Sequence, residues 1–442
     1  MRKPNRNVHA LACNALTIAL PAIAFTFVTI AGVSAGTEKT LHSFCNENNC
    51  GDGDTPRNGL VMDAAGNLYG TTEFGGKHNE GLVYKLIPNA GHTKYTEHIL
   101  KSFCAKPGCT DGAYPDSELI MDMDGNIYGT TEVGGKHGGG EVFRMKPVTN
   151  GWTFAVIHSF CAHPPGCSDG DTPYGGLAYA GQTTGAPWNE TSSLFGTTSL
   201  GGGPDKGTVY SLTPGVSGWS YQVLHVFNPS GNPDSVYPGP LVVDASGDVV
   251  GVTYYGAANG AGALYRLASG SWTEDTLHNF CADASCSDGA NGLGRLAIDA
   301  NGNIFGVTLA GGSGSHCPES NGCGVAFERT ASGHYKVIYD FCSKTNCKDG
   351  LEPSAGLTMD ASGNLYGVTH IGGKGNLGVV FLLGSGGGWP ESVLYAFCSQ
   401  TNCTDGAGPA APVIMDDTGN VYGTTAEDGA NGSGGTAYRL AP

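Results

Sequence analysis

The sequence is poor in positive charge. Its 442 residues include 22 lysines and arginines against 39 aspartates and glutamates, a formal net charge of −17 at pH 7. A chain this acidic repels the phosphates of nucleic acids and the headgroups of anionic lipids, so we expect neither as a partner. Cations and neutral or basic partners remain compatible with the charge.

Helical periodicity is also lacking. No stretch repeats apolar residues at a helical spacing over any length. Glycine makes up 73 residues, about 17% of the chain against a usual share of about 7%. So much glycine opposes helix formation and is typical of many tight turns.

Only one apolar run, "ALTIALPAIAFTFVTIAG" from Ala15, is long enough to cross a membrane. A basic segment precedes it, the first acid is Glu38, and the small residues "VSA" end it at Ala35. This layout predicts a secretory signal peptide over residues 1–35, with an uncleaved anchor as the alternative. Cleavage would remove three positive charges and leave a net charge of −20. We expect a secreted, extracellular protein without stable membrane insertion.

The rest of the chain is a tandem repeat. A motif related to "DAAGNLYGTT" occurs seven times, and the 407 residues after the signal give about 58 residues a copy. The seven motifs begin at Asp63, Asp122, Ser192, Asp244, Asp299, Asp360 and Asp416. In the first copy, apolar alternation and turn residues predict four strands, over residues 59–63, 67–72, 82–88 and 95–103.

Seven units of four antiparallel strands predict an all-β fold, a seven-bladed β-propeller over residues 36–442. Tandem sandwiches would need longer units, and a β-solenoid would have a much shorter period. The last copy ends after its third strand, at Thr436–Pro442, whereas Thr40–Phe44 matches the fourth strand of the other copies. We therefore expect the two ends of the chain to complete one blade together and close the ring.

Cysteines other than Cys13, which lies in the predicted signal, come in close pairs. Each has a partner five or six positions away, which predicts seven disulfides in an oxidising compartment. The predicted disulfides join Cys45 and Cys50, Cys104 and Cys109, Cys161 and Cys167, Cys281 and Cys286, Cys317 and Cys323, Cys342 and Cys347, and Cys398 and Cys403. Pairs on different blades could not converge on one zinc ion, and no thiol stands alone as a nucleophile. Each short loop would contribute roughly 2 kcal/mol.

The pattern GL-x-x-D-x-x-GN-x-YGTT-x-x-GG, followed by G-x-V-[YF]-x-L, resembles the GloVer-type extracellular tandem repeat of choice-of-anchor proteins. The resemblance covers essentially the whole chain after residue 35. It implies secretion or surface display, and it brings no catalytic residues with it. The chain ends at Pro442 without a sorting tail, which favours free release over anchoring.

Ionisable residues that break the repeat are the candidates for a ligand site. The loops between the second and third strands should share one face of the propeller, termed here the upper face, with the cysteine loops. In blades six, seven, one and two, the loops between the second and third strands form an acidic arc that includes histidines. We expect this arc to bind a ligand through Glu73, His78, Glu132, His137, His370 and Glu427. Tyr254 and Leu309 occupy the opposite, apolar arc. The alternative is ordinary solvated loop charge.

Six cysteine loops end in Asp-Gly. These acids could hold a cation such as calcium, but no copy has the dense alternating acids of a calcium loop. We therefore favour Asx turns, and expect no cofactor, for Asp52, Asp111, Asp169, Asp288, Asp349 and Asp405. Four histidines two positions before the fourth-strand phenylalanine are interpreted as packing residues on the outer rim: His42, His158, His225 and His278. In the insertion from Ala180, Trp188 is expected to pack under its own loop.

Regular repeats, the absence of an isolated nucleophile and a fold that often serves as a platform favour a non-enzymatic binding or scaffold protein. We expect a monomer with a carbohydrate or a surface protein as its partner at the upper face. The alternative is an extracellular polysaccharide lyase or hydrolase, in which Glu73, Glu132, His370 and Glu427 would act. A purely structural role in a matrix is a third possibility.

Overall fold

The computed structural model describes residues 36–203, 206–227, 235–430, 432 and 434–442. The predicted signal peptide and Cys13 lie outside these ranges. Within them, no helix is long and apolar enough to span a membrane.

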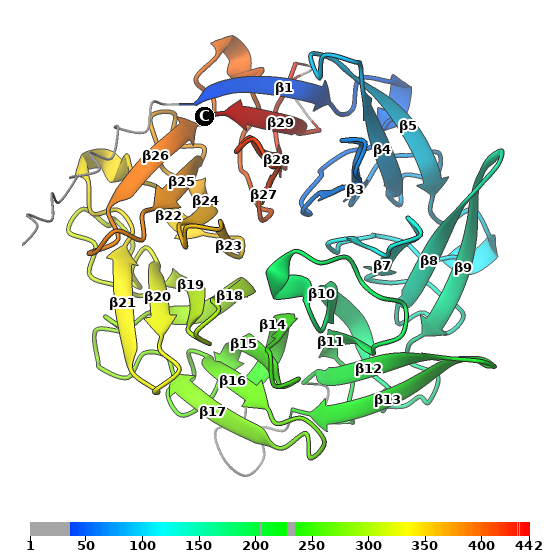
Figure 1. The fold of residues 1–442 in the computed structure, drawn as a ribbon, viewed down its shortest axis with the longest axis horizontal. Helices are drawn as coiled ribbons and strands as arrows, with labels where there is room; N and C mark the ends of the chain where they lie inside the picture. Colours follow the sequence, from blue (N-terminus) through cyan, green and yellow to red (C-terminus); the bar gives the residue numbers. More distant parts are fainter. Residues whose placement is uncertain (1–35, 204–205, 228–234, 431, 433) are drawn as a thin grey trace, which may run out of the picture. The chain divides into compact units, whose positions relative to one another are not determined.

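The described residues form seven antiparallel sheets arranged around a central axis, which confirms the predicted propeller (Figure 1). Blades 1 to 3 consist of β2 (Val61–Met62), β3 (Leu68–Thr72), β4 (Leu82–Pro88) and β5 (Tyr95–Ser102); of β6 (Ile120–Met121), β7 (Ile127–Thr131), β8 (Glu141–Val148) and β9 (Gly151–Ser159); and of β10 (Asp171–Tyr179), β11 (Leu194–Leu200), β12 (Thr208–Gly215) and β13 (Gly218–Val226). Within each blade the strands follow one another from the axis outward.

Blades 4 to 6 repeat this order. They consist of β14 (Ser235–Val243), β15 (Val249–Gly256), β16 (Ala263–Leu267) and β17 (Glu274–Asn279); of β18 (Ala290–Ile298), β19 (Ile304–Ala310), β20 (Val325–Arg329) and β21 (Tyr335–Asp340); and of β22 (Leu351–Pro353), β23 (Thr358–Met359), β24 (Leu365–Ile371), β25 (Val379–Leu383) and β26 (Glu391–Ala396). In blade 6 the innermost strand is interrupted, so that β22 and β23 both pair with β24.

Blade 7 joins the two ends of the chain. It consists of β27 (Ile414–Met415), β28 (Val421–Thr425), β29 (Thr436–Ala441) and β1 (Thr37–Ser43), in the order β1-β29-β28-β27. The pairing of β1 with β29 is antiparallel, from Thr37 opposite Ala441 to Ser43 opposite Thr436. The predicted closure of the ring by the N-terminal strand is confirmed, and Figure 1 shows β1 beside β29.

The core lies within and between the blades and is built from the repeat itself. The phenylalanine that follows each fourth strand is fully buried and contacts an aromatic ring on the third strand of the next blade, as Phe44 of blade 7 contacts Tyr84 of blade 1 with 4.9 Å between ring centroids. The glycine of "YGTT" faces that same ring. A β-carbon on Gly251 would lie 2.7 Å from the Tyr265 hydroxyl oxygen and 2.9 Å from a Leu241 methyl carbon, so this position admits only glycine.

Substituting Gly251 with alanine is therefore expected to destabilise the protein by about 1–3 kcal/mol, because the core would be overpacked. Gly239→Ala is the matched control, since its β-carbon would meet no atom closer than 3.6 Å. Chemical denaturation of both variants would measure the difference. Equal stability of the two variants would contradict this account of the repeat.

All seven predicted disulfides are present, and six of them close the cysteine loops of their blades. The bonds join Cys45 to Cys50, Cys104 to Cys109, Cys161 to Cys167, Cys281 to Cys286, Cys317 to Cys323, Cys342 to Cys347, and Cys398 to Cys403. The pairing predicted from the spacing is thus confirmed for every cysteine in the described ranges. The disulfides support the extracellular assignment, because such bonds persist in oxidising compartments.

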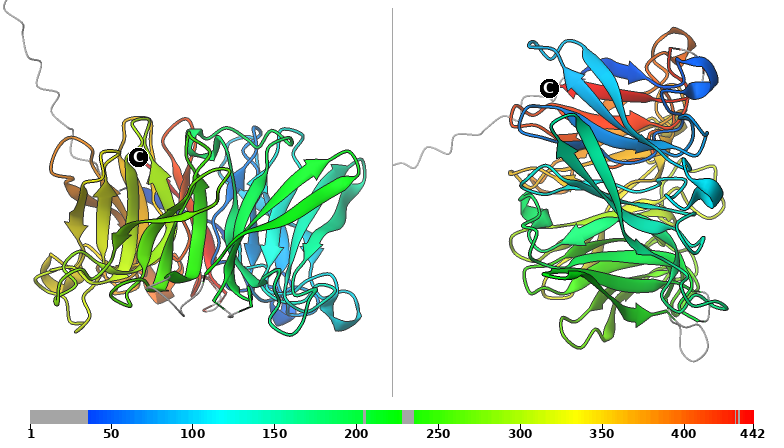
Figure 2. Two further views of the ribbon diagram at one scale, coloured as in Figure 1. Left: turned by 90° about the horizontal axis from the view of Figure 1, so that it is seen from below. Right: turned by 90° about the vertical axis from the view of Figure 1, so that its right-hand side faces the viewer.

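The cysteine loops and the loops between second and third strands share the upper face, as predicted. The Gly76 N–H donates to the Cys50 carbonyl, and the Gly135 N–H donates to that of Cys109. Figure 2 shows the strands running between this face and the opposite one.

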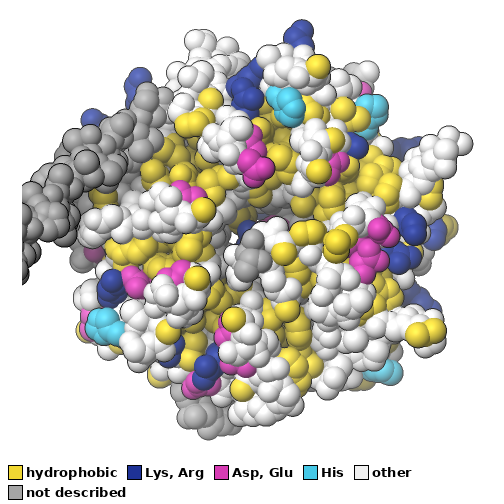
Figure 3. Space-filling view, in the orientation of Figure 1, with side chains coloured by type: hydrophobic (Ala, Val, Ile, Leu, Met, Phe, Trp, Pro, Cys, Tyr) yellow, Lys and Arg dark blue, Asp and Glu magenta, His cyan; other side chains and the backbone are white. Residues whose placement is uncertain are grey.

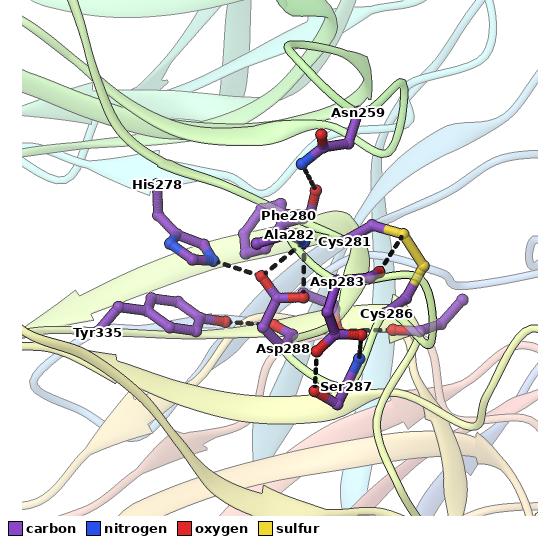
Figure 4. Close-up of polar contacts among 12 residues, drawn as sticks. Asn259, His278, Phe280, Cys281, Ala282, Asp283, Cys286, Ser287, Asp288 and Tyr335 are labelled. Carbon is purple, nitrogen blue, oxygen red and sulfur yellow. Dashed lines mark hydrogen bonds and ion pairs between the residues drawn. A yellow bond between two sulfur atoms is a disulfide. The ribbon is translucent and has the colours of Figure 1, made fainter.

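The aspartates of Asp-Gly hold the cysteine loops. The N–H groups of Asn46 and Glu47 donate to the Asp52 carboxylate at 2.9 and 3.1 Å, and the other five loops repeat this contact. Figure 4 shows the loop of Asp288. The carboxylates accept from N–H groups five to seven positions upstream, because the closed disulfide loop brings its own start back to the aspartate. The predicted Asx turn was therefore wrong in detail.

The insertion after β10 covers the lower face. Trp188 is buried and its indole N–H donates to the Ser192 carbonyl oxygen at 3.2 Å, which confirms that it packs under its own loop. Its ring also contacts Tyr128 of blade 2 and Trp219 of blade 3, at 5.1 and 5.7 Å between centroids. Figure 3 shows this lower face, which is hollowed near the axis by a cavity of about 680 Å³ with Met62, Met121 and Met415 in its wall.

Candidate functional site

The central channel is lined by two rings of side chains from the innermost segments of the blades. Alternate residues of an extended segment point the same way, so in six blades positions two apart contribute to the two rings, whereas in blade 4 two adjacent residues do. The upper ring contains Arg57, Asp116, Tyr174, Gly239, Leu293, Ser354 and Ala410, and the lower ring contains Gly59, Glu118, Gly176, Pro240, Arg295, Gly356 and Pro412. A cavity of about 310 Å³ lies between the upper ring and Glu118.

An ion pair crosses the channel in the lower ring. The Arg295 guanidinium of blade 5 lies 3.1 Å from the Glu118 carboxylate of blade 2, and both side chains are about four-fifths buried. Glu118 lines the channel cavity and also the larger cavity of the lower face. The pair therefore separates the two cavities, and the upper one opens toward the cysteine-loop face.

Three acids of blades 1 and 2 gather at the upper mouth, and we call Glu73, Asp116 and Glu132 the acidic cluster. Burial raises the pKa of Glu73, and the charges of Asp116 and Glu132 raise it further, against the opposing charge of Arg57. Burial also raises the pKa of Glu132, with a contribution from Asp116. Arg57, whose guanidinium lies 3.4 Å from Glu73, is half exposed and is the cation that acts on this cluster.

Asp116 is the member of the cluster that lines the channel cavity. Burial raises its pKa, while a hydrogen bond from the Asn58 side chain and the charge of Arg57 oppose the rise. The Asn58 amide is itself held by Thr71 Oγ1 at 3.1 Å and by the Pro115 carbonyl at 3.3 Å. Burial and the charge of Asp116 thus both oppose ionisation of Glu73 and Glu132.

An aromatic pocket adjoins the acidic cluster. Its volume is about 430 Å³, and its wall is formed by Tyr174, Tyr237 and Tyr254 with Leu293, while Glu132 lies at its border. Tyr174 also lines the channel cavity, so the two spaces are contiguous. The sequence analysis placed only Tyr254 and Leu309 on this side. Tyr174 and Tyr237, like Asp116, were missed.

The predicted arc is only partly assembled. Glu73 and Glu132 belong to the acidic cluster, and His370 lines the channel cavity. His370 and the exposed Glu427 approach the same glycine, Gly408, whose β-carbon would lie 2.9 Å from His370 Cε1 and 3.6 Å from Glu427 Cδ. These four residues surround the upper mouth. Their role in binding stays a prediction.

The two loop histidines are placed differently. His78 and His137 are both exposed. Burial lowers the pKa of His158 on the outer strand β9, and the charge of His137 adds to this effect, which puts His137 at the rim and not at the channel. The glycine-rich loops turn outward at this point, because Gly134, Gly135 and Gly138 all have positive φ angles.

Comparison with known families gives one match. The model of the Gloeobacter/Verrucomicrobia repeat matches residues 26–189, 182–346 and 315–442, and so accounts for nearly all of the chain. No curated protein matches the sequence.

Solved structures match at the level of the fold. Two crystal structures of the extracellular domain of a B. thetaiotaomicron protein, described as a one-component or hybrid two-component system, align with TM-scores of 0.50 and 0.51 at 10% and 11% identity. They cover 91% and 92% of this chain, which spans about 40% of their own length. A gluconolactonase of Xanthomonas campestris aligns with a TM-score of 0.38 at 12% identity, over 74% of this chain and 87% of its own.

Proposed function

This chain belongs to the Gloeobacter/Verrucomicrobia repeat family, and we propose that it is a secreted protein that binds a saccharide at the upper mouth of its channel. The contiguity of the aromatic pocket with the acidic cluster carries the proposal. Tyrosine rings offer an apolar face to the C–H groups of a sugar ring and a hydroxyl to its polar edge. The pocket of about 430 Å³ is within the usual range for small-ligand sites, roughly 300–1,000 Å³.

The charges at the site select the class of saccharide. Glu73, Asp116 and Glu132 accept hydrogen bonds from sugar hydroxyls, and they attract an amino group. They repel the carboxylate of a uronic acid or a sulfate group. The proposed ligand is therefore a neutral or amino sugar, as a terminal or an internal unit of a polysaccharide.

Titration calorimetry with neutral, amino-sugar and uronic-acid oligosaccharides tests the proposal. We expect Tyr237→Ala to weaken binding at least about tenfold, because it removes the aromatic face. Tyr366→Ala is the matched control, since that tyrosine follows a hairpin of the lower face and hydrogen-bonds Asp360 there. Melting temperatures verify that both variants are folded. Equal affinities of the two variants, or the tightest binding to uronic-acid chains, would overturn the proposal.

Catalysis is the second candidate, and the acidic cluster favours it. Glycoside hydrolases use two carboxyl groups whose environments keep one protonated, and here burial and the charge of Asp116 raise the pKa of Glu132. If the protein is a hydrolase, the same oligosaccharides should be cleaved, and Glu132→Gln should abolish turnover with no change in melting temperature. A binding protein would yield no product from any of them.

A further inference from the structure

Each junction between neighbouring blades brings together three positions of the repeat. These are the residue two before the buried phenylalanine of one blade, the aspartate of the following Asp-Gly, and the residue six before the phenylalanine of the next blade. We call such a set a junction triad. The triad between blades 7 and 1 consists of His42 of β1, Asp52 of the first cysteine loop and Glu97 of β5.

In three of the other described junctions the acids have partners that neutralise or cap them. Lys101 pairs with Asp111 at 2.5 Å between blades 1 and 2. In the junctions between blades 5 and 6 and between blades 6 and 7, a tyrosine hydroxyl donates to the aspartate. These bonds run from Tyr339 to Asp349 and from Tyr395 to Asp405, both at 2.7 Å. The third residue has a partner of its own there: Lys344 pairs with Oε2 of Glu391, and the Gln400 amide donates to Glu38.

Two junctions pair a histidine with a tyrosine. His158 stacks on Tyr221 and His278 stacks on Tyr335, at 3.8 and 3.6 Å between ring centroids. In both, the tyrosine hydroxyl donates to the backbone carbonyl of the triad aspartate. Figure 4 shows the second of these, with His278 Nε2 2.8 Å from Asp288. These histidines are packing residues, as the sequence analysis interpreted them. The remaining junction, between blades 3 and 4, includes residues outside the described ranges.

The triad of blades 7 and 1 differs from all five. It combines a histidine at the first position with a glutamate at the third, so an imidazole and two carboxylates face one another: His42 Nε2 lies 3.8 Å from Asp52 Oδ2 and 3.9 Å from Glu97 Oε2. His42 Nε2 and Glu97 Oε1 are closed off from solvent and have no hydrogen-bond partner within the described ranges. The same holds for His158 Nε2, Asp169 Oδ1 and Glu391 Oε1 in other junctions, so what sets this triad apart is the second carboxylate that faces the imidazole. The charges that act on Glu97 are those of Asp52 and Glu47, both negative. Buried polar atoms without partners are costly, so this site is incomplete as the protein alone.

We propose that His42, Asp52 and Glu97 bind a divalent transition-metal ion, best matched by Zn²⁺, at the junction where the ring closes. Imidazole nitrogen and carboxylate oxygen are both zinc donors, and three protein ligands leave the fourth position to water. Zinc bonds to these atoms are about 2.0–2.1 Å long, so tetrahedral ligand atoms lie about 3.3 Å apart, and the present spacing needs to contract by about half an ångström.

The surroundings of the triad hold its side chains in place. The His42 ring meets the edge of the buried Phe44 at 4.6 Å between centroids. Two backbone N–H groups fix the Asp52 carboxylate, and Glu97 lies in β5 opposite Leu86. Such supporting contacts orient ligands before a metal binds. Bound zinc would link the N-terminal strand to the first blade and so fasten the closure of the ring.

Calorimetric titration of ZnCl₂ into the secreted protein, after treatment with EDTA and dialysis, tests the site. We expect one Zn²⁺ per chain, at least tenfold weaker binding in Glu97→Gln and His42→Gln, and unchanged binding in His278→Gln. Glu97→Gln preserves shape and hydrogen-bonding capacity, so it keeps the test valid if the His42 variant fails to fold. Zinc should also raise the melting temperature of the wild type but not of Glu97→Gln, because a ligand stabilises only the state that it binds.

Cobalt gives an independent readout. Co²⁺ in place of Zn²⁺ should produce the visible absorption of a four- or five-coordinate nitrogen and oxygen site, and the band should vanish in Glu97→Gln. Failure to bind zinc would overturn the proposal. So would equal affinity in the wild type and both triad variants, which would assign the ion to exposed histidines such as His78 or His137.

Discussion

Deleting residues 36–44 is expected to lower the melting temperature by at least about 5 °C. The deletion removes β1 and its pairing with β29, so the outer edge of blade 7 would be exposed to water. It also removes Leu41 and Phe44, which are 8% and 0% exposed. Loss of a buried leucine and a buried phenylalanine costs about 2–5 and 3–5 kcal/mol respectively. Each kcal/mol corresponds to about 1 °C in a domain of about 400 residues, because the entropy of unfolding grows with chain length.

Calorimetry of the deletion variant in EDTA would separate this effect from any metal bound by His42. Phe44→Ala should reproduce a large part of the loss, whereas Thr37→Ala, a change at an exposed position of the same strand, should leave the melting temperature unchanged. A deletion variant that melts with the wild type would show that blade 7 is stable with three strands and that the closure has no energetic role.

The fold followed from the sequence because each blade is specified locally. The alternation of apolar residues, the turn at "AAGN" and the glycine of "YGTT" recur in almost every copy, so seven weak signals add to one strong one. The closure was also predictable, since Thr40–Phe44 matches a fourth strand and the last copy is the one that lacks a fourth strand. The disulfides followed from spacing alone, because only near neighbours in sequence were available as partners.

The candidate site was less predictable. The sequence analysis looked for breaks in the repeat after the second strand and so found Glu73, Glu132 and His370. Asp116 and Tyr174 lie instead on the innermost segment, directly after a proline that most copies share. The signal existed: this position varies freely around the ring, from Arg57 to Ala410, while the residue before it is proline in all copies but one. The side chain at this position faces the channel and packs in no blade core, so packing does not restrict which residue occurs there.

The junction triads could not be found by scanning single copies. His42, His158 and His278 occupy the same repeat position, and their sequences alone suggest one role. What distinguishes them is the residue they meet in the next blade, Glu97 or a tyrosine, more than 50 positions downstream. Aligning each copy with its successor, instead of with all the others, would have revealed the difference.

The stability of the protein is expected to fall as the pH rises from about 4.5 to 8, and Glu141→Gln is expected to remove a large part of this loss. Glu141 begins β8 where other copies have Leu82 or Thr208, and it is completely buried with neither carboxyl oxygen hydrogen-bonded. Burial, with the added charge of Asp111, raises its pKa from 4.5 to about 8, although Lys101 and Lys106 oppose the rise.

The sign follows from proton binding. Between pH 4.5 and 8 the folded protein keeps the proton on Glu141 while the unfolded chain has lost it, so the folded state binds more protons and loses stability as the pH rises. At about 1.4 kcal/mol per pKa unit, the loss amounts to roughly 3–5 kcal/mol across this window. Glu38 and Glu97, whose pKa values burial raises to about 7 and about 8, act in the same direction. The test must therefore compare variant and wild type at each pH.

Urea denaturation of wild type and Glu141→Gln at half-unit steps from pH 4.5 to 8.5 measures this difference. The two proteins should be similarly stable at pH 4.5, and the variant should gain steadily on the wild type up to about pH 8, because glutamine has the shape of the neutral acid but no proton to lose. Glu319→Gln, a change at an exposed glutamate, should run parallel to the wild type throughout. A constant difference across the range would mean that Glu141 is not held protonated by its burial. The carboxylate would then have to be stabilised by groups that reach it in solution.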